Sequence, residues 1–291
     1  MRTYLDCIPC CVRQALDASR MVTDDVAVQE RVLRETLALV NTIEFHRPPP
    51  WLGQQIHRFL KTATGDADPY REAKHRSNRL ARELYPRLEE AVHAAADPFA
   101  AAIRFAIAGN TIDFGVKTHI TDADVREAVH VAETAPLDEA VLTRFRRAIE
   151  SARDILYLAD NAGEILFDRL LIERLPTNKL AVVVRGQPII NDATREDAEA
   201  AGLPAIVEVI DNGSDVPGTI PELCSPAFRE RLARCDLLIS KGQGNYETLD
   251  GIAKRVFFLL RAKCPVIARH IGCEIGCMVL YENGYPQDGP V

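Results

Sequence analysis

The sequence contains no apolar run long enough to cross a membrane, and its N-terminus lacks the charged-then-apolar pattern of a secretory signal. We therefore predict a cytoplasmic protein with no membrane partner. The chain also has no excess of positive charge: it contains 35 lysine and arginine residues and 42 aspartate and glutamate residues, for a formal net charge of −7. A chain of this charge offers no basic surface to a nucleic-acid backbone, so we expect no nucleic-acid partner.

The motifs of several enzyme classes are missing too. The chain has neither a Walker A run nor the Gly-x-Ser-x-Gly turn of a serine nucleophile. Gly242 and Gly244 do not form a dinucleotide fingerprint, which needs its glycines between the first strand and the first helix. What is present is an ordinary globular composition, 47% hydrophobic and 26% charged over 291 residues. Such a chain can form one large α/β domain or two smaller ones.

The first part of the chain predicts helices, because its apolar residues recur at helical spacing. Asp-Pro pairs at residues 68–69 and 97–98 supply a cap and a first turn for two of these helices. The predicted helices cover residues 9–20, 26–45, 52–60, 70–95, 99–108, 122–133 and 137–151.

Beyond residue 150, apolar strands alternate with helices. The predicted strands cover residues 155–159, 180–185, 205–210, 237–240, 256–260 and 265–268, with helices at 165–175, 194–201 and 226–234. This alternation indicates a mostly parallel, doubly wound, Rossmann-like sheet with helices on both faces. We therefore predict two regions, a helical N-terminal region at 1–150 and an α/β core at 151–291.

Polar residues directly follow three of the predicted strands. Asp160 and Asn161 follow the first strand, Asp192 lies in the loop after the second, and Lys241 follows the fourth. Ligands of open α/β sheets gather at the carboxyl ends of the strands, so these side chains can converge on one crevice. The simpler interpretation is that Asp160 and Asp192 cap the helices that follow them and that Lys241 is solvated.

This combination of side chains suits a metal and a phosphate. Two carboxylates and an amide are ligands for a hard divalent cation such as Mg²⁺ or Mn²⁺. Lys241, with backbone amides of the glycine-rich turns, can neutralise an oxyanion beside the cation. Phosphoryl transfer needs this set of groups. The attacking group is either Asp160 itself or a water held by the metal, and the sequence leaves both open.

The eight cysteines form a second group of candidates, and in the cytoplasm we expect them to stay reduced. Cys7 and Cys10 make a Cys-x-x-Cys pair near the N-terminus, and three others lie near the end of the chain: Cys264, Cys273 and Cys277. They could bind zinc, form a redox pair or simply be buried. Cys224 and Cys235 are typical of a core. We place no catalytic role on a cysteine.

Five segments together carry a resemblance across nearly the whole chain: residues 7–10, 109–115, 160–164, 191–194 and 241–245. In these segments and their order the chain resembles the damage-control phosphatase family, formerly domain of unknown function 89, in its prokaryotic stand-alone branch. The resemblance implies a metal-dependent phosphatase of damaged or surplus phosphometabolites, with a helical domain beside an α/β core. One branch of the family has also been described as a carboxyl methyltransferase that uses S-adenosylmethionine.

The resemblance also implies roles for individual residues. The metal, as Mg²⁺, Mn²⁺, Ni²⁺ or Co²⁺, would be held by Asp160, Asn161 and Asp192. The catalytic groups would be Asp160, Lys241 and Asp113. The substrate phosphate would be bound by residues of three loops: Asn110, Asp113, Gly163, Glu164, Lys241, Gly242 and Asn245.

The leading hypothesis is therefore a metal-dependent phosphomonoesterase acting on a small phosphate ester. A methyltransferase is an alternative, but it needs no divalent metal and usually has several glycines in the turn after its first strand, where this chain has Asp160 and Asn161. A non-catalytic protein that binds a metal or metabolite is the other alternative. Nothing in the sequence selects a sugar phosphate over a nucleotide or a pantetheine phosphate, and the oligomeric state stays open.

Overall fold

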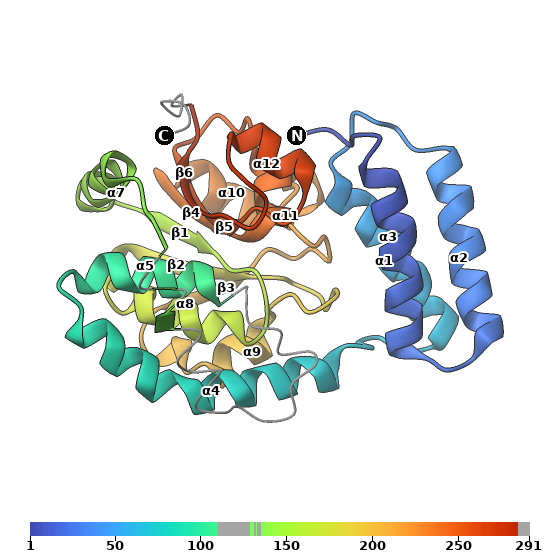
Figure 1. Cartoon of the computed structure of the whole chain (residues 1–291), viewed down its shortest axis with the longest axis horizontal. Helices are drawn as coiled ribbons and strands as arrows, with labels where there is room; N and C mark the ends of the chain where they lie inside the picture. Colours follow the sequence, from blue (N-terminus) through green and yellow to red (C-terminus); the bar gives the residue numbers. More distant parts are fainter. Residues whose placement is uncertain (110–128, 131, 133–134, 285–291) are drawn as a thin grey trace.

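The computed structural model describes residues 1–109, 129–130, 132 and 135–284, with a single six-stranded sheet at its centre (Figure 1). The strand order is β3-β2-β1-β4-β5-β6. The first five strands are parallel, and β6 is antiparallel to β5. The strands are β1 (Ile155–Leu158), β2 (Leu180–Val184), β3 (Glu208–Asp211), β4 (Leu237–Lys241), β5 (Val256–Arg261) and β6 (Met278–Glu282).

The described helices surround this sheet, and none of them is long and apolar enough to span a bilayer. The helices are α1 (Cys7–Val22), α2 (Val26–Asn41), α3 (Pro49–Thr64), α4 (Arg71–Ala94), α5 (Pro98–Ala108), α7 (Glu139–Ser151), α8 (Glu164–Ile172), α9 (Arg195–Ala200), α10 (Pro226–Arg234), α11 (Gly242–Leu249) and α12 (Pro265–Ile271). Short 3₁₀ turns lie at Thr177–Lys179, Leu203–Ala205 and Pro221–Leu223.

Helices cover both faces of the sheet, as the alternating pattern predicts. The central strands are buried along their whole length, which is the environment that apolar runs without polar breaks require. Successive side chains point to opposite faces, so Ile155 and Tyr157 belong to the core cluster that includes residues of α4, α5, α7 and α8. Leu156 and Leu158 belong to the cluster that includes residues of α10, α11 and α12. The first of these clusters crosses residue 150, where the sequence predicts the boundary between the two regions.

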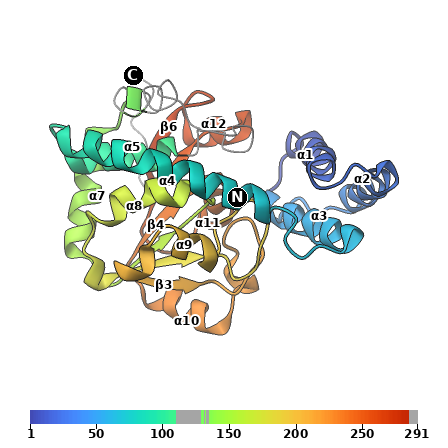
Figure 2. The ribbon, with the colours of Figure 1, turned by 90° about the horizontal axis from the view of Figure 1, so that it is seen from below.

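Helices α1, α2 and α3 lie beside the sheet and have small hydrophobic clusters of their own (Figures 1 and 2). Polar contacts from α3 join this group to the loops that follow β2 and β3. Arg58 Nε lies 2.6 Å from Asp215 Oδ2, and Gln54 Nε2 donates to Asp215 Oδ1 at 2.5 Å. Lys61 donates to the carbonyl of Pro188. The helical group is therefore fastened to two loops at the carboxyl edge of the sheet.

The sheet has two edges of different construction. On one side β6 pairs with β5 in the antiparallel direction. On the other side β3 is four residues long and only half buried, with exposed Glu208 and Asp211 at its ends.

The structure differs from the sequence predictions at four elements. The predicted strand at 265–268 is the start of α12, because Pro265 fills the first helical turn, where a proline loses no hydrogen bond. Strand β6 was not predicted. Helix α11 was not predicted either, since its glycine-rich start resembles a loop. The strand predicted at 205–210 begins at Glu208, after a 3₁₀ turn. Most of the predicted helix at 122–133 lies outside the described residues.

Candidate functional site

The three candidate metal ligands lie together where β1 and β2 end. Asp160 and Asn161 follow β1, and a β-bridge pairs Asn161 with Asp192 in the loop after β2. Backbone hydrogen bonds hold the two segments side by side: Ala193 N donates to Asp160 O, and Ala162 N donates to Asn191 O, each at 2.8 Å. Two neighbouring parallel strands thus bring the three side chains to one place on the carboxyl edge, as the strand-end pattern predicts.

Negative charge is concentrated at this place. Asp160 is only 9% exposed. Burial, and then the charges of Glu164 and Asp192, raise the pKa of Asp160 to about 8. Burial also raises the pKa of Asp192, although the guanidinium of Arg185 opposes this rise. Carboxylates crowded out of water in this way are stabilised by a cation placed among them.

The donor atoms fit a hard divalent cation. The Asn161 amide donates through Nδ2 to Asp160 Oδ2 at 2.9 Å and to Glu164 Oε2 at 3.0 Å. Arg185 Nε donates to Asp192 Oδ2 at 2.6 Å. No described residue donates a hydrogen bond to Asn161 Oδ1 or to Asp192 Oδ1. Two carboxylates and an amide can thus present oxygens to a cation that prefers oxygen ligands.

No larger metal-binding group exists among the described residues. The structure places no three or more histidine, cysteine, aspartate or glutamate side chains where they could hold an ion together. A cation at Asp160, Asn161 and Asp192 would therefore have coordination positions left for water and substrate oxygens.

Gly242, a predicted substrate-binding residue, lies directly against Asp160 at the start of α11. Its φ of 78° falls in the left-handed region, and a Cβ at this position would lie 2.0 Å from Asp160 Oδ2. No other residue fits here without moving the carboxylate. The N-terminus of α11 is therefore held in contact with the candidate metal site.

Lys241, a predicted catalytic and phosphate-binding residue, is buried behind the site. Its side chain is 0% exposed, and Nζ donates to the carbonyl of Ala106 and to Glu164 Oε1, each at 2.7 Å, and to Asp168. Burial alone would lower the pKa of Lys241, but Asp168 and Glu164 together raise it. An ammonium has three N–H donors, and all three are used inside the protein. The predicted phosphate contact of Lys241 would have to break one of these bonds.

Glu164 and Asn245, both predicted to bind substrate, connect buried parts of the site. Glu164 accepts from Lys241 through Oε1 and from Asn161 through Oε2, so it links the buried ammonium to a candidate metal ligand. Asn245 donates to the carbonyls of Ala159 at 3.2 Å and Lys241 at 2.8 Å, which ties the ends of β1 and β4 together. These contacts position the residues that face the crevice.

Arg185 is a site residue whose role the sequence did not reveal. It is the first residue after β2, and its side chain is buried. Besides Asp192 it contacts Thr219 Oγ1 at 3.3 Å and Asn245 Oδ1 at 3.2 Å. Arg185 thereby fixes one oxygen of Asp192 and leaves the other for a ligand. An arginine directly at the end of an apolar strand is the signal that could have identified it.

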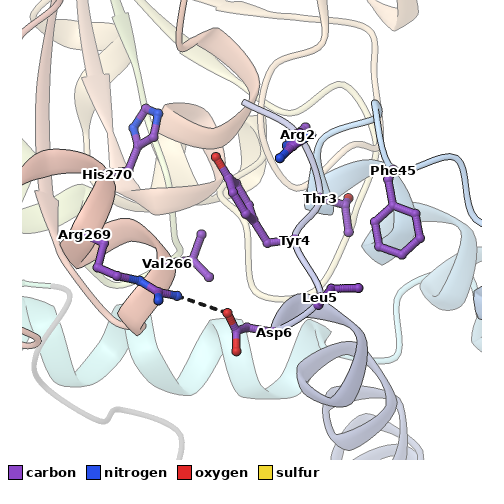
Figure 3. Close-up of a pocket in the computed structure, with 9 residues that line it drawn as sticks. All are labelled: Arg2, Thr3, Tyr4, Leu5, Asp6, Phe45, Val266, Arg269 and His270. Atoms are coloured by element: carbon purple, nitrogen blue, oxygen red, sulfur yellow. Dashed lines mark hydrogen bonds and ion pairs between the residues drawn. The ribbon is translucent and has the colours of Figure 1, made fainter.

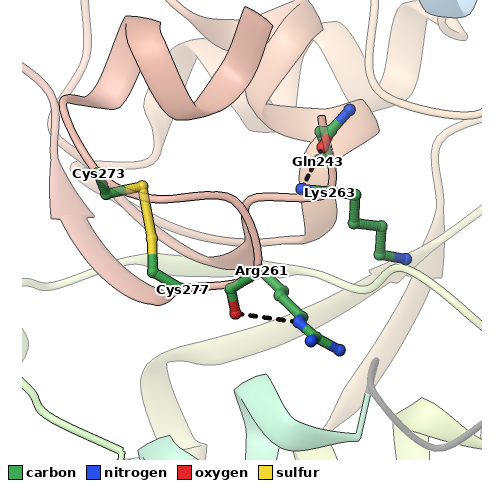
Figure 4. The surroundings of a disulfide bond; sticks show 6 residues. Gln243, Arg261, Lys263, Cys273 and Cys277 are labelled. Carbon is green, nitrogen blue, oxygen red and sulfur yellow. Dashed lines mark hydrogen bonds between the residues drawn. A yellow bond between two sulfur atoms is a disulfide. The ribbon is translucent and has the colours of Figure 1, made fainter. Parts of the chain in front are cut away.

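Lys263, between β5 and α12, is a second residue that the sequence did not reveal. Its side chain is exposed, and its charge acts to lower the pKa of Asp160. Its backbone N–H donates to Gln243 Oε1 at 3.1 Å, which places it beside the first turn of α11 (Figure 4). Among the described residues, none forms an ion pair with Lys263. Lys263 is therefore a cation that a bound anion can reach.

The cysteines do not gather into a metal site in the described chain. Cys273 and Cys277 form a disulfide in the turn before β6, which differs from the expectation that every cysteine is reduced (Figure 4). Burial raises the pKa of Cys7 and of Cys10, so neither thiol is an activated nucleophile. Cys224 and Cys235 are buried in the core, as predicted.

We expect Cys7 and Cys10 to be dispensable for catalysis. The double change to serine should leave turnover within about tenfold of the wild-type value, because phosphoryl transfer at carboxylates requires no thiolate. Stability could fall in the same variant without altering this expectation. Steady-state phosphate release, measured on protein shown to be folded by circular dichroism, tests it. Complete loss of activity in the folded variant would show that the cysteine pair belongs to the active site.

A separate pocket of about 650 Å³ lies between the N-terminal segment and α12 (Figure 3). Residues 2–6 form one wall, and the rest is lined by Phe45, Val266, Arg269 and His270. Arg269 pairs with Asp6 at 3.0 Å, and His270 Nδ1 lies 2.6 Å from the Tyr246 hydroxyl. None of the described candidate site residues lines this pocket, so it is distinct from the strand-end site.

Two predicted site residues lie outside the described residues. Asn110 and Asp113 follow α5, in the part of the chain for which no placement is described. Their predicted roles in binding and catalysis stay predictions.

Comparison with known proteins gives one consistent result. The sequence pattern of the damage-control phosphatase ARMT1-like domain matches residues 3–279. A damage-control phosphatase of Archaeoglobus fulgidus is 36% identical over 287 residues, covering 94% of this chain and 96% of that protein. A damage-control phosphatase of Pyrococcus horikoshii is 32% identical over 290 residues, covering 98% and 99%. The crystal structure of a DUF89 family protein from Pyrococcus horikoshii has a TM-score of 0.88, with 32% identity, over 97% of this chain and 99% of that one.

Proposed function

The chain belongs to the damage-control phosphatase ARMT1-like family, and from this premise we propose that it is a metal-dependent phosphomonoesterase of small phosphometabolites. The names of the two relatives above, both damage-control phosphatases, support the phosphatase activity. The geometry of the site supports the metal dependence.

The observation that carries the metal dependence is the group of buried oxygens at the ends of β1 and β2. Asp160 and Asp192 are buried acids whose pKa values are raised. Asp160 lies near the charges of Glu164 and Asp192, and Asp192 is paired with the guanidinium of Arg185. With Asn161, they would hold the divalent cation. When bound, such a cation polarises a phosphate oxygen and offsets the charge that develops as the ester bond breaks.

The chain's own residues would orient the substrate around this centre. Lys263 would pair with the phosphate from the side of β5, since its ammonium is exposed and its charge already acts on Asp160. The first N–H groups of α11, which begins at Gly242, would face the same anion, as helix N-termini favour negative charge. Lys241 would hold Glu164 in place, and Glu164 would hold the Asn161 amide with its oxygen toward the cation.

A phosphate-release screen tests the proposed function. A panel of sugar phosphates, nucleotides and pantetheine phosphates is incubated with the protein and with Mg²⁺, Mn²⁺, Ni²⁺ or Co²⁺ in turn. We expect turnover on at least one ester, and its loss after thorough chelation. Activity that survives chelation would contradict the metal dependence. Absence of hydrolysis on every ester, with methyl transfer from S-adenosylmethionine instead, would contradict the phosphatase assignment.

Lys263 provides a sharper test of substrate binding. The change Lys263→Gln should raise KM by roughly 10–100-fold, because a hydrogen bond to a charged group contributes about 1.5–3 kcal/mol. Mn²⁺ affinity, measured by calorimetry without substrate, should not fall, since Lys263 donates no metal ligand and its positive charge opposes a second cation beside Asp160. Lys263→Arg is the matched control, because it keeps the charge, and its KM should stay close to the wild-type value. Equal kinetics in the glutamine variant and the wild type would remove Lys263 from the site.

A further inference from the structure

We propose that Asn78, on α4, is a positioning residue that holds the two metal-binding loops in place; this inference rests on the metal site of the proposed function. Asn78 lies outside every segment that carries the family resemblance. It is 5% exposed and sits between the loop that follows β1 and the helix that follows the β2 loop.

The first contact of Asn78 is with the turn that carries Asp160 and Asn161. Its Oδ1 accepts a hydrogen bond from Gly163 N at 2.7 Å. Gly163 has a φ of 77°, and a Cβ there would lie 3.0 Å from Ser77 Cβ, so α4 packs tightly on this turn. Gly163 precedes the first residue of α8, and its N–H is one that a helix start leaves without an intrahelical partner. Asn78 satisfies this N–H and fixes the turn two residues after Asn161.

The second contact of Asn78 reaches the loop that carries Asp192. Its Nδ2 donates to Asp197 Oδ1 at 2.8 Å. The other oxygen of Asp197 accepts from the backbone N–H and the hydroxyl of Thr194, each at 2.8 Å. Thr194 is two residues after Asp192 and bridges to Arg185, which binds Asp192. Asn78 thus reaches the second loop through one buried carboxylate.

A buried lysine supports the same carboxylate. Lys74, one turn before Asn78 on α4, lies 3.5 Å from Asp197 Oδ2 and 3.3 Å from Asp68 Oδ2. Its ammonium lies against the carboxylate of Asp197, which accepts hydrogen bonds from both α4 and the Thr194 turn. A single carboxamide is the side chain that this geometry needs, because it must accept from Gly163 on one side and donate to Asp197 on the other.

The consequence is that α4 fixes the relative positions of the side-chain oxygens that would bind the metal. Asp160 and Asn161 come from one loop and Asp192 from the next, and only their relative placement makes a coordination sphere. Removing a residue that orients metal ligands from outside the coordination sphere typically lowers metal affinity by about 10–100-fold. Loss of the hydrogen bonds of Asn78 should therefore weaken metal binding, while a site saturated with metal should keep nearly the wild-type turnover.

The test compares Asn78→Ala with Ser77→Ala. Ser77 is the neighbour on the same helix, and its hydroxyl donates only to the carbonyl of Ala73 within α4. Mn²⁺ affinity is measured by calorimetry without substrate, and urea unfolding confirms that each variant is folded. We expect Asn78→Ala to bind Mn²⁺ at least about tenfold more weakly, with kcat and KM near wild type at saturating Mn²⁺, whereas Ser77→Ala keeps the wild-type affinity.

Wild-type Mn²⁺ affinity in folded Asn78→Ala would overturn the inference and leave the proposed function standing. An equal loss in both variants would also overturn it, because the effect would then belong to α4 as a whole. If the wild-type protein itself binds no Mn²⁺ and yet hydrolyses esters, the metal site falls and the inference falls with it. Should Asn78→Ala fail to fold, the milder Asn78→Ser is measured, with the same expected and contrary results.

Discussion

Asp160→Asn should lower turnover by roughly a hundredfold or more, because the metal that it helps to hold contributes several kcal/mol of transition-state stabilisation. The change keeps the shape of the side chain and removes one negative charge from the candidate ligand set. Mn²⁺ affinity should fall sharply for the same reason. Asp192→Asn should behave alike, since its Oδ1 would face the cation while Arg185 occupies its Oδ2.

Metal-free stability separates this effect from simple unfolding. Glu164 and Asp192 both oppose the charge of Asp160, so its removal relieves repulsion. Metal-free Asp160→Asn should therefore melt at least as high as the metal-free wild type. Asp211→Asn is the matched control, because Asp211 ends the neighbouring strand β3 and pairs with Arg195 outside the site. The control should keep both metal affinity and turnover.

Excess metal distinguishes the two possible roles of Asp160. If Asp160 serves only as a ligand, high Mn²⁺ should restore part of the turnover of Asp160→Asn. If Asp160 is the nucleophile, no metal concentration restores it, whereas Asp192→Asn still recovers in part. Wild-type kinetics in both variants would contradict the proposed mechanism.

Lys241→Met should destabilise the fold by about 3–5 kcal/mol, because it leaves Glu164 and Asp168 buried without their cation. Urea unfolding measures the loss. The matched control is Lys179→Met: Lys179 also donates three hydrogen bonds, but all three go to carbonyls, those of Ile149, Glu150 and Ala152. The control should lose much less stability, since no buried charge is abandoned.

A second change identifies which interaction is lost. Adding Asp168→Asn to Lys241→Met removes one of the two stranded carboxylates, so the double variant should recover part of the stability. Equal stability of Lys241→Met and Lys179→Met would show that the buried ion pairs contribute little. Turnover should fall in Lys241→Met as well, because Glu164 would no longer be held against the Asn161 amide.

The parallel core could be predicted because each central strand contains an unbroken apolar run of at least three residues. Such runs identify strands that are covered on both faces, and the alternation with helices then determines the sheet type. The run at 265–268 failed because four apolar residues fit a buried helix turn as well as a strand, and Pro265 favours the helix start. Strand β6 was not predicted from the sequence because it is a partly exposed edge strand that ends in Tyr281 and Glu282.

The place of the site could be predicted, whereas the direction of Lys241 could not. Strand ends locate Asp160, Asn161 and Asp192 without knowledge of packing. Lys241, however, shares a strand face with Leu237 and Ile239, which pack against the helices of the first cluster. Its ammonium therefore points to Asp168 and away from the crevice. Asn78 and Lys263 could not be found at all, since their importance arises from contacts between segments far apart in the chain.

The construction of β3 has a consequence for the behaviour of concentrated protein. An edge strand with free backbone groups is a template on which a second copy can add its own strand, which is the first step toward fibrils. Antiparallel pairing of two β3 edges would set Glu208 of one copy near Asp211 of the other at both ends of a four-residue strand. Like charges opposite one another destabilise such pairing. The acidic ends of the short β3 thus disfavour antiparallel pairing of two copies through this strand.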